Sequence, residues 1–477
     1  MKLSQGWAQP SAVFDDENLV SVAGLVPVLA LAERAGLSEL IEAKVVLGSN
    51  RVASAGVNPA GKLTAVIAGM AAGADCIDDL QVIRSGGMGK LFGGVYAPAT
   101  LGQFLREFTH GHVAQLASVA RAHLINLIGE VPDLLLGIET RALVDIDSLL
   151  RPVYGPAKEG ASFGHTKIAG KSVMRRGLSP LATTISTRTG APVLAGVRLR
   201  AGRAGSAKGA ASMVREAVSL ARAAGATGEV LVRGDSAYGN RHVVGAARAA
   251  GARFSVALQR NPALDRAIAA IAEDAWKTVN YPGAVLDPDT GELISEAEVA
   301  EISFTAFAST KTPVTARLVV RRVRDRERSG VNAETGELFP VWRHHPFLTD
   351  STEDTVAADL THRRHAIIET VFADLIDGPL AHLPSGRFAA NAAWATAAMI
   401  THNLLRAAGV LAGGPNTTAR GATLRRRLVL VPARPARPQR RPVLHLPAHW
   451  PWAGAFNALW DKVFNPVATG PPVPALS

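Results

Sequence analysis

Apolar residues dominate residues 141–148, and their pattern predicts a buried β-strand. Alternation gives the strand an apolar face and an acidic face: Ala142, Val144 and Ile146 against Leu143, Asp145 and Asp147. A buried carboxylate costs several kcal/mol unless it is paired or binds a metal. The two acids therefore predict either a divalent cation at the end of this strand or an exposed exit from strand to loop.

A second apolar stretch at residues 229–236 also ends in an acid, Asp235. A third acid, Glu369, lies beside the apolar stripe of a helical region that begins near residue 356. The intervals are 88 residues (235 − 147) and 134 residues (369 − 235). Two strand-end aspartates and a helical glutamate can converge on two divalent metals, and carboxylate and water ligands favour Mg²⁺ or Mn²⁺.

The hydrophobic pattern divides the chain into five blocks and predicts an α/β fold class. Residues 1–138 are mostly helical, with a helix expected to begin at an N-cap Thr100 and another to span residues 112–128. Residues 139–259 alternate strand and helix, residues 260–350 form a β-rich insertion, and residues 351–410 are helical. Residues 411–477 form a Gly-, Pro- and Arg-rich tail, in which residues 432–442 are expected to be extended and solvated.

The charge of the chain predicts a polyanionic partner, because the net charge is +11 and residues 378–460 contain ten arginines and no acid. Arg425, Arg426 and Arg427 are the densest group. The loop 202–209 lacks the spacing and the terminal Lys-Ser/Thr of a P-loop, so no nucleotide site is expected there. A single cysteine, Cys76, excludes an internal disulfide and a Cys-rich zinc site. Without an apolar run of about 18 residues, the chain is expected to lie in the cytoplasm rather than in a membrane.

Three motifs resemble the DDE-type transposases of bacterial insertion sequences. These motifs are Val144-Asp145-Ile146-Asp147-Ser148, Val232-Arg233-Gly234-Asp235-Ser236-Ala237-Tyr238 and His362-Arg363-Arg364-His365-Ala366-Ile367-Ile368-Glu369. Shorter matches are Ala23-Gly24-Leu25, Gly73-Ala74-Asp75, Asp78-Asp79-Leu80, Ala97-Pro98-Ala99-Thr100-Leu101, Leu383-Pro384-Ser385 and Trp450-Pro451-Trp452. The likeness covers nearly the whole chain. It is strongest to the group that carries a β insertion between the second Asp and the Glu.

The resemblance implies an RNase H-like catalytic core, formed by residues 139–259 and 351–410, with a helical DNA-binding domain before it and a basic tail after it. It implies that Asp147, Asp235 and Glu369 bind two Mg²⁺ or Mn²⁺ ions, with Asp145 as a close competitor or neighbour of Asp147. Arg363, Arg364 and His365 are expected to hold a terminal phosphate, and Trp342 to stack on a displaced base.

The implied partners are double-stranded DNA, as transposon ends and target, and a second copy of the chain in a homodimer. The implied location is the cytoplasm, in association with the nucleoid.

Three other functions stay open at this stage. A nuclease of the same fold would cut DNA without joining it. An inactive DNA-binding relic is suggested by Leu149, where the family usually has Thr, and by Ile376, where it often has a basic residue. A glycosidase built on Asp145 and Asp147 is disfavoured, because the two acids are one residue apart on a strand and no aromatic sugar platform is evident.

Overall fold

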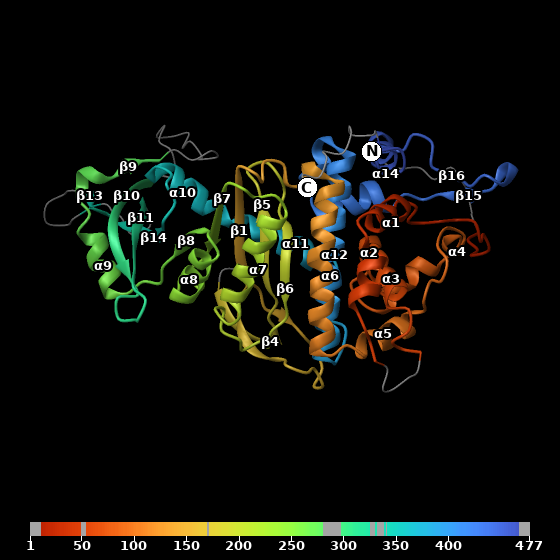
Figure 1. Cartoon of the computed structure of the whole chain (residues 1–477), viewed down its shortest axis with the longest axis horizontal. Helices are drawn as coiled ribbons and strands as arrows, with labels where there is room; N and C mark the ends of the chain where they lie inside the picture. The colour runs from red at the N-terminus through yellow and green to blue at the C-terminus, as the bar shows by residue number, and fades with distance from the viewer. Residues whose placement is uncertain are drawn as a thin grey trace, which may run out of the picture.

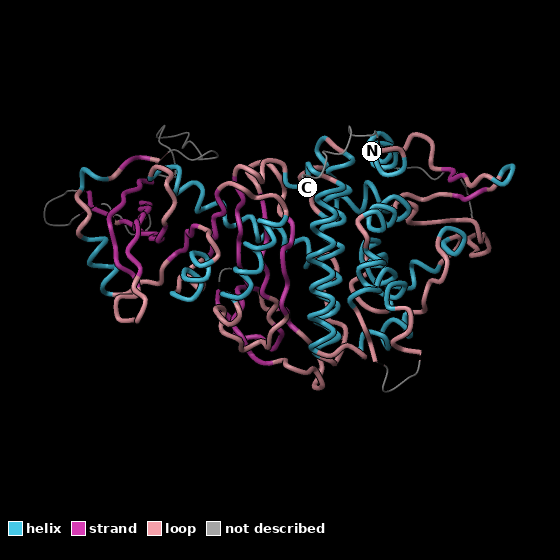
Figure 2. The backbone as a smooth tube through the Cα atoms, viewed as in Figure 1, coloured by secondary structure: helices cyan, strands magenta, loops and turns pink. Residues whose placement is uncertain are grey.

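The computed structural model describes residues 11–48, 54–168, 171–279, 297–324, 330–331, 338–339 and 341–466. The molecule is elongated, with a twisted β-sheet in its middle and at one end and a helical region at the other end (Figure 1). The strands lie in the middle and at one end, with helices beside them, whereas the other end is almost entirely helical (Figure 2). Within the described ranges, no helix is both long and apolar enough to cross a lipid bilayer.

The described residues form one large mixed sheet of nine strands. In spatial order its strands are β6 (Val193–Arg198), β5 (Leu181–Ser186), β1 (Arg141–Ser148), β7 (Glu229–Gly234), β8 (Arg253–Ala257), β14 (Trp342–Thr349), β11 (Val314–Arg324), β10 (Ala297–Ala306) and β9 (Lys277–Thr278). Strand β1 is antiparallel to β5 and parallel to β7, and β7 is parallel to β8. The mixed α/β fold expected from the sequence is confirmed.

The strands of the expected insertion continue this sheet. Strand β14 pairs antiparallel with β8, with Phe347 opposite Ala257, and β11 and β10 follow in antiparallel order. The remaining short strands of this region are β12 (Gly330–Val331) and β13 (Leu338–Phe339). The insertion therefore extends the sheet to one end of the molecule, where β9, β10 and β14 lie in Figure 1.

Helices that follow the strands cover the sheet. They are α7 (Ala210–Ala223), α8 (Arg241–Ala249), α9 (Pro262–Ala269), α10 (Thr355–Arg363) and α11 (Ile367–Ile376). Helix α7 packs on β5, β1 and β6, and α11 packs on β1. Helix α7 fits this position because its buried residues, among them Met213, Val214 and Ala217, lie on one face.

The helical region is built around α12 (Phe388–Ala412), which is almost entirely buried. The other helices of this region are α1 (Leu25–Arg34), α2 (Leu37–Lys44), α3 (Pro59–Ala72), α4 (Met88–Leu91), α5 (Pro98–Arg106) and α6 (His110–Glu130). Helix α12 also contacts the outermost strand, β6, where the Asn403 side chain accepts a hydrogen bond from Leu194 N and donates one to Leu194 O. Asn403 thus satisfies backbone groups at the sheet edge that would otherwise be unpaired.

The C-terminal segment folds back onto the start of the chain. After α13 (Gly421–Leu424) and a π-helical turn (Arg425–Val429), the backbone of Val429 and Val431 accepts hydrogen bonds from Gly24 N and Ala23 N. The final helix α14 (Ala453–Phe464) packs on α1 and α12. Between them, β15 (Arg434–Ala436) and β16 (Val443–His445) form a short exposed hairpin in the part of the tail expected to be extended.

Candidate catalytic site

Asp147 and Asp235 occupy equivalent positions on two neighbouring parallel strands. The register of β1 and β7 ends with Ile146 opposite Gly234, so each aspartate is the next residue of its chain. Adjacent strands are about 4.8 Å apart, and aligned residues of parallel strands point to the same face. Asp147 is half-buried and Asp235 is exposed. The two carboxylates therefore lie side by side where the central strands β1 and β7 end, at the edge of the sheet formed by the carboxyl ends of these strands, where solvent can reach them.

Tyr238 provides a second indication that the two aspartates are close. Its ring is fully buried, and its hydroxyl donates a hydrogen bond to Ser148 Oγ at 2.9 Å. Burial raises the pKa of Tyr238, and the negative charges of Asp147 and Asp235 raise it further. Both carboxylates therefore lie within electrostatic reach of one phenol. Tyr238 follows Asp235 by three residues and reaches back to the residue after Asp147, which ties the ends of β1 and β7 together.

Asp145 forms an ion pair with Arg233 on the neighbouring strand. Arg233 donates from Nε to Asp145 Oδ1 at 2.7 Å and from Nη2 to Asp145 Oδ2 at 2.8 Å. Both side chains are only 1% exposed. Arg233 also donates from Nη1 to the Thr361 carbonyl at 2.7 Å, at the end of α10. By alternation the pair lies on the same face as Asp147 and Asp235, one step further into the sheet.

Glu369 lies in the first turn of α11 and is exposed. The helix is held against β1 by its buried stripe of Ile368, Val371, Phe372 and Leu375, as the sequence predicts. A carboxylate in the first turn is favoured by the helix dipole. The position of Glu369 is thus fixed by helix packing, while its side chain remains free of the core.

The carboxylates of Asp147, Asp235 and Glu369 are not all within 4.8 Å of one another. Among the described residues, Asp75, Cys76 and Asp79 form the single group of three potential ligands that meets this distance. That group lies at the turn after α3, where the Cys76 thiol donates a hydrogen bond to Asp79 and so lowers the pKa of Asp79. The arrangement is therefore an adjacent pair of aspartates at the ends of β1 and β7, with Glu369 on a helix that packs on β1.

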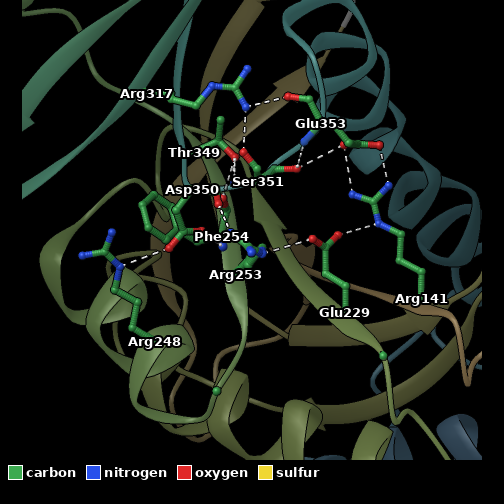
Figure 3. A network of polar contacts seen from close by, with 12 residues as sticks. Arg141, Glu229, Arg248, Arg253, Phe254, Arg317, Thr349, Asp350, Ser351 and Glu353 are labelled. Atoms are coloured by element: carbon green, nitrogen blue, oxygen red, sulfur yellow. Dashed lines mark hydrogen bonds and ion pairs between the residues drawn. The ribbon is translucent and has the colours of Figure 1, made fainter.

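A network of ion pairs holds the opposite end of the same strands (Figure 3). Arg141, at the start of β1, contacts Glu229 of β7 at 2.8 Å and binds both carboxylate oxygens of Glu353. Arg253 of β8 contacts the second oxygen of Glu229 at 3.2 Å. Burial alone raises the pKa of Glu353, but the hydrogen bonds and charge of Arg141 outweigh it and hold that pKa below its usual value. Glu353 lies just before α10, so the network anchors the chain that leads to Glu369.

The three basic residues before Glu369 have different environments. Arg363 Nε contacts Asp359 at 3.0 Å, one turn earlier in α10. Arg364 is exposed. His365 Nδ1 donates to the His362 carbonyl at 2.7 Å, and its ring lies 5.0 Å from the His362 ring. Arg364 is therefore the most accessible of the three cations expected to contact phosphate.

Trp342 lies against a guanidinium. Arg322 is placed between two indoles, with its Cζ 4.4 Å from the ring centre of Trp342 and 4.3 Å from that of Trp276. Arg322 also pairs with Glu273 and Glu298. Trp342 is half-buried, so one part of its ring is used by this stack while another part stays accessible.

The arginines of the tail divide between the interior and the surface. Arg425 is buried, donates to the Asp377 carbonyl at 2.7 Å at the end of α11, and has a pKa lowered by that burial. Arg426 is exposed, and Arg427 is half-buried. Both lie over Trp452, with Cζ 5.2 and 5.9 Å from its ring centre. Part of the tail's charge therefore stabilises the fold.

Sequence patterns alone missed Arg233 and Tyr238 as parts of this site. Each is close in sequence to Asp235, two residues before it and three after it. Their partners, Asp145 and Ser148, lie 88 and 90 residues earlier in the sequence. The available signal was the presence of one unexplained charge in each apolar strand, Arg233 in one and Asp145 in the other.

The sequence was also compared with models of known protein families. A sequence model of the family described as "Transposase DDE domain group 1" matches residues 8–466. Because this match spans nearly the whole chain, the protein belongs to that family of transposases. A search of curated proteins found no match.

Proposed function

We propose that this protein is the transposase of an insertion sequence, which cuts DNA at the ends of its element and joins the freed ends to a target. The observation that carries the proposal is the placement of Asp147 and Asp235 at equivalent ends of two parallel strands. Family membership supplies the expectation of a DDE site, and the equivalent positions of Asp147 and Asp235 support their part in it.

The strand order supports an RNase H-like core for this activity. Strands β6, β5 and β1 are successively antiparallel, and β7 and β8 then add in parallel to β1. In this interpretation residues 139–259 and 351–410 form the catalytic core, and residues 260–350 are inserted before the catalytic glutamate. Residues 1–138 form a DNA-binding domain, and residues 411–477 form a basic tail.

The donor set fits hard divalent cations. Asp147, Asp235 and Glu369 offer oxygen ligands only, as Mg²⁺ and Mn²⁺ prefer. When bound, two such ions stabilise negative charge on the attacking and leaving oxygens of a phosphodiester displacement. Asp145 is less suited to this role, because both of its oxygens accept hydrogen bonds from Arg233.

The residues around the carboxylates hold them in place during the reaction. The Asp145–Arg233 pair fixes β1 against β7, and the Tyr238–Ser148 hydrogen bond fixes their ends. Water attacks the phosphorus at the element's end, its oxygen bonds to phosphorus, and the 3′ oxygen leaves as a hydroxyl. That hydroxyl then attacks a target phosphodiester and displaces a target 3′ oxygen. No side-chain nucleophile takes part in either step.

The proposed partners are double-stranded DNA and a second copy of the chain on paired ends. Arg364 and the exposed arginines of the tail, such as Arg426, are proposed to contact phosphates. Residues 1–138 are proposed to read the terminal repeats.

The test uses Asp235→Asn in the full chain, with Asp265→Asn as a matched control. Asp265 is an exposed aspartate in α9 that pairs with Arg260, at the other end of the sheet. The substrate is a plasmid that carries the gene with its natural flanks. We expect Asp235→Asn to lose Mg²⁺-dependent cleavage by more than about a thousandfold, as expected for loss of metal-assisted chemistry, while DNA binding persists. Undiminished cleavage in this variant would refute the site, and cleavage without joining in the wild type would identify a nuclease.

A further inference from the structure

A second strongly basic segment lies outside the C-terminal tail. Residues 148–215 contain twelve lysines and arginines and one acid, Glu159, for a net charge of +11 (12 − 1). The basic residues are Arg151, Lys158, Lys167, Lys171, Arg175, Arg176, Arg188, Arg198, Arg200, Arg203, Lys208 and Arg215. This value equals the net charge of the whole chain. The segment begins directly after Asp147, so the chain that leaves the catalytic edge is strongly basic.

The chain between β1 and β5 forms a small three-stranded sheet at that edge. Its order is β2 (Arg151–Pro152), β4 (Lys171–Leu178) and β3 (Ser162–Ile168), all antiparallel. The main sheet resumes with Leu181 opposite Ser148 and Ala182 opposite Asp147. The small sheet therefore lies in the chain between Ser148, the residue after Asp147, and Leu181, its partner in the main sheet. Figure 1 shows β4 at the lower end of the main sheet.

The loop 201–209 packs onto the small sheet. A Cβ added to Gly202 would lie 2.2 Å from Ser162 O and 2.4 Å from Gly177 O, so only glycine allows this approach. Arg203 N also donates to Ser162 Oγ at 2.8 Å. The loop and the strands thus form one continuous surface.

Arg200 braces this loop from beneath and connects it to the catalytic edge. Its side chain is 6% exposed and donates to the carbonyls of Ser206 at 2.8 Å and Lys208 at 3.0 Å. Its charge also lies close enough to Tyr238 to lower the pKa of that phenol, whose hydroxyl donates to Ser148. A continuous set of buried contacts therefore runs from the basic loop to the residue beside Asp147.

Some cations of this segment are used inside the fold and others face solvent. Arg151, Lys158 and Arg176 donate to backbone carbonyls, for example Arg151 to Ala381 O at 2.6 Å. Arg175, Arg203 and Lys208 are exposed. Their side chains are therefore available to an outside partner.

Large apolar side chains are also exposed in this segment. Tyr154 is 82% exposed, Phe163 60% and Met174 51%. Phe163 and Met174 are on the same face of the small sheet, because Phe163 pairs with Arg176 and Met174 pairs with His165. Arg175 pairs with Gly164 and so lies on the opposite face, the one onto which the loop 201–209 packs through Gly202. The exposed cations therefore gather on the loop face, and such a basic face favours the phosphates of a nucleic acid.

We propose that the small sheet and the loop 201–209 bind the DNA backbone next to the catalytic carboxylates. The proposal rests on the proposed function for the identity of the DNA, and it adds a binding surface that neither the basic tail nor the residues before Glu369 provide. DNA is favoured over a protein partner because the segment carries twelve cations against one acid. Arg175, Arg203 and Lys208 are the phosphate contacts.

The test compares two triple variants of the full chain that remove the same charge. Arg175→Gln/Arg203→Gln/Lys208→Gln removes the proposed contacts. Arg188→Gln/Arg266→Gln/Lys311→Gln removes three other exposed cations: Arg188 lies in the turn after β5 at the opposite end of the strands, Arg266 in α9 and Lys311 in the turn after β10. Binding of a random-sequence DNA duplex is measured by fluorescence anisotropy in EDTA, so that no cleavage is involved.

We expect the first variant to bind DNA more than about tenfold more weakly and to show a salt dependence of log K reduced by about two to three, since each phosphate contact contributes about 0.9. The control variant should keep a slope within about one of the wild type. Hydrogen exchange on the wild type should also slow in residues 162–166, 173–178 and 201–209 when DNA is added.

Two results would overturn the proposal. One is equal binding and equal salt slope in the two variants. The other is a change of oligomeric state in the first variant with unaltered DNA affinity, which would identify the surface as an interface between copies of the chain. Because binding is measured without metal, a wild type that binds DNA through this surface but never cuts it would contradict the proposed function alone.

Discussion

Arg233 binds both carboxylate oxygens of Asp145, at 2.7 and 2.8 Å, in a place where neither side chain reaches solvent. The pair bridges the two strands that end in Asp147 and Asp235, and its third hydrogen bond reaches Thr361 at the end of α10. One guanidinium thus connects the strands of both aspartates with the helices that lead to Glu369. The pair is therefore a framework for the site rather than part of its chemistry.

Removing one partner of this pair should destabilise the protein strongly. Asp145→Ala leaves the Arg233 charge buried without its partner, and such a loss costs about 3–5 kcal/mol. The double variant Asp145→Leu/Arg233→Met removes both charges and should recover much of that loss. Urea unfolding of the wild type, both single variants and the double variant measures the coupling. A double variant no more stable than the single ones would show that packing, not charge burial, dominates here.

Glu353→Gln should loosen the chain before α10. The amide cannot accept two charged hydrogen bonds from Arg141, so we expect a loss of about 1–3 kcal/mol in the free energy of unfolding. Hydrogen exchange should accelerate in α10. The control is Glu216→Gln, whose pair with Arg198 is about two-fifths exposed on both sides and should contribute about 0.5 kcal/mol or less. Equal effects of the two substitutions would contradict the anchoring role of the network.

His123 should make the protein sensitive to mild acid. It is buried in α6, and burial lowers its pKa to about 4, below its ordinary value of 6.5. The unfolded chain therefore binds a proton at a higher pH than the folded protein does. The contribution of His123 to stability is complete above about pH 6.5 and falls by about 3 kcal/mol as the pH drops to about 4.

The measurement for His123 is the slope of unfolding free energy against pH. His123→Gln should reduce that slope by up to one bound proton between pH 6.5 and 4, while the buried His362 and His402, whose pKa values are also lowered by burial, keep the rest. His110→Gln, at an exposed position in the first turn of the same helix, should leave it unchanged. A slope in His123→Gln equal to that of the wild type would contradict the assignment to His123.

Gly24→Ala should disturb the contact between the two ends of the chain. A Cβ at this position would lie 1.7 Å from Leu428 O, so the backbone of one segment must move. We expect a loss of more than about 2 kcal/mol and faster proteolysis of the exposed hairpin β15–β16. Gly89→Ala is the control, because nothing lies within 4 Å of the added carbon there. Stability of Gly24→Ala within about 0.5 kcal/mol of the wild type would mean that the two segments separate readily.

Strands with apolar alternation were predicted well from the sequence. Residues 141–148 form β1 with the expected limits, and the second acid-terminated strand spans Glu229–Gly234. The signal was strong because both strands are buried and rich in β-branched and aliphatic residues. The small sheet of β3 and β4 went unrecognised, because glycine and lysine interrupt any alternation there.

Details that depend on competing local signals were predicted less well. The expectation of an N-cap at Thr100 is wrong, because α5 begins at Pro98, a residue whose fixed φ suits the first turn. Arg425 was expected to face DNA, but it turns inward to a carbonyl at the end of α11. Charge along a sequence cannot distinguish an arginine that caps a helix from one that faces solvent, because both occur in the same arginine-rich stretch.

The contact between Gly24 and Val429 also has a consequence for synthesis of the protein on the ribosome. The chain emerges from its N-terminus, so residues 20–24 are made more than four hundred residues before the backbone groups that bind them. At about 5–20 residues per second, this interval is about 20–80 seconds. Throughout that time the first helices lack their final neighbours, and their packing is completed only after residues 429–433 have been made.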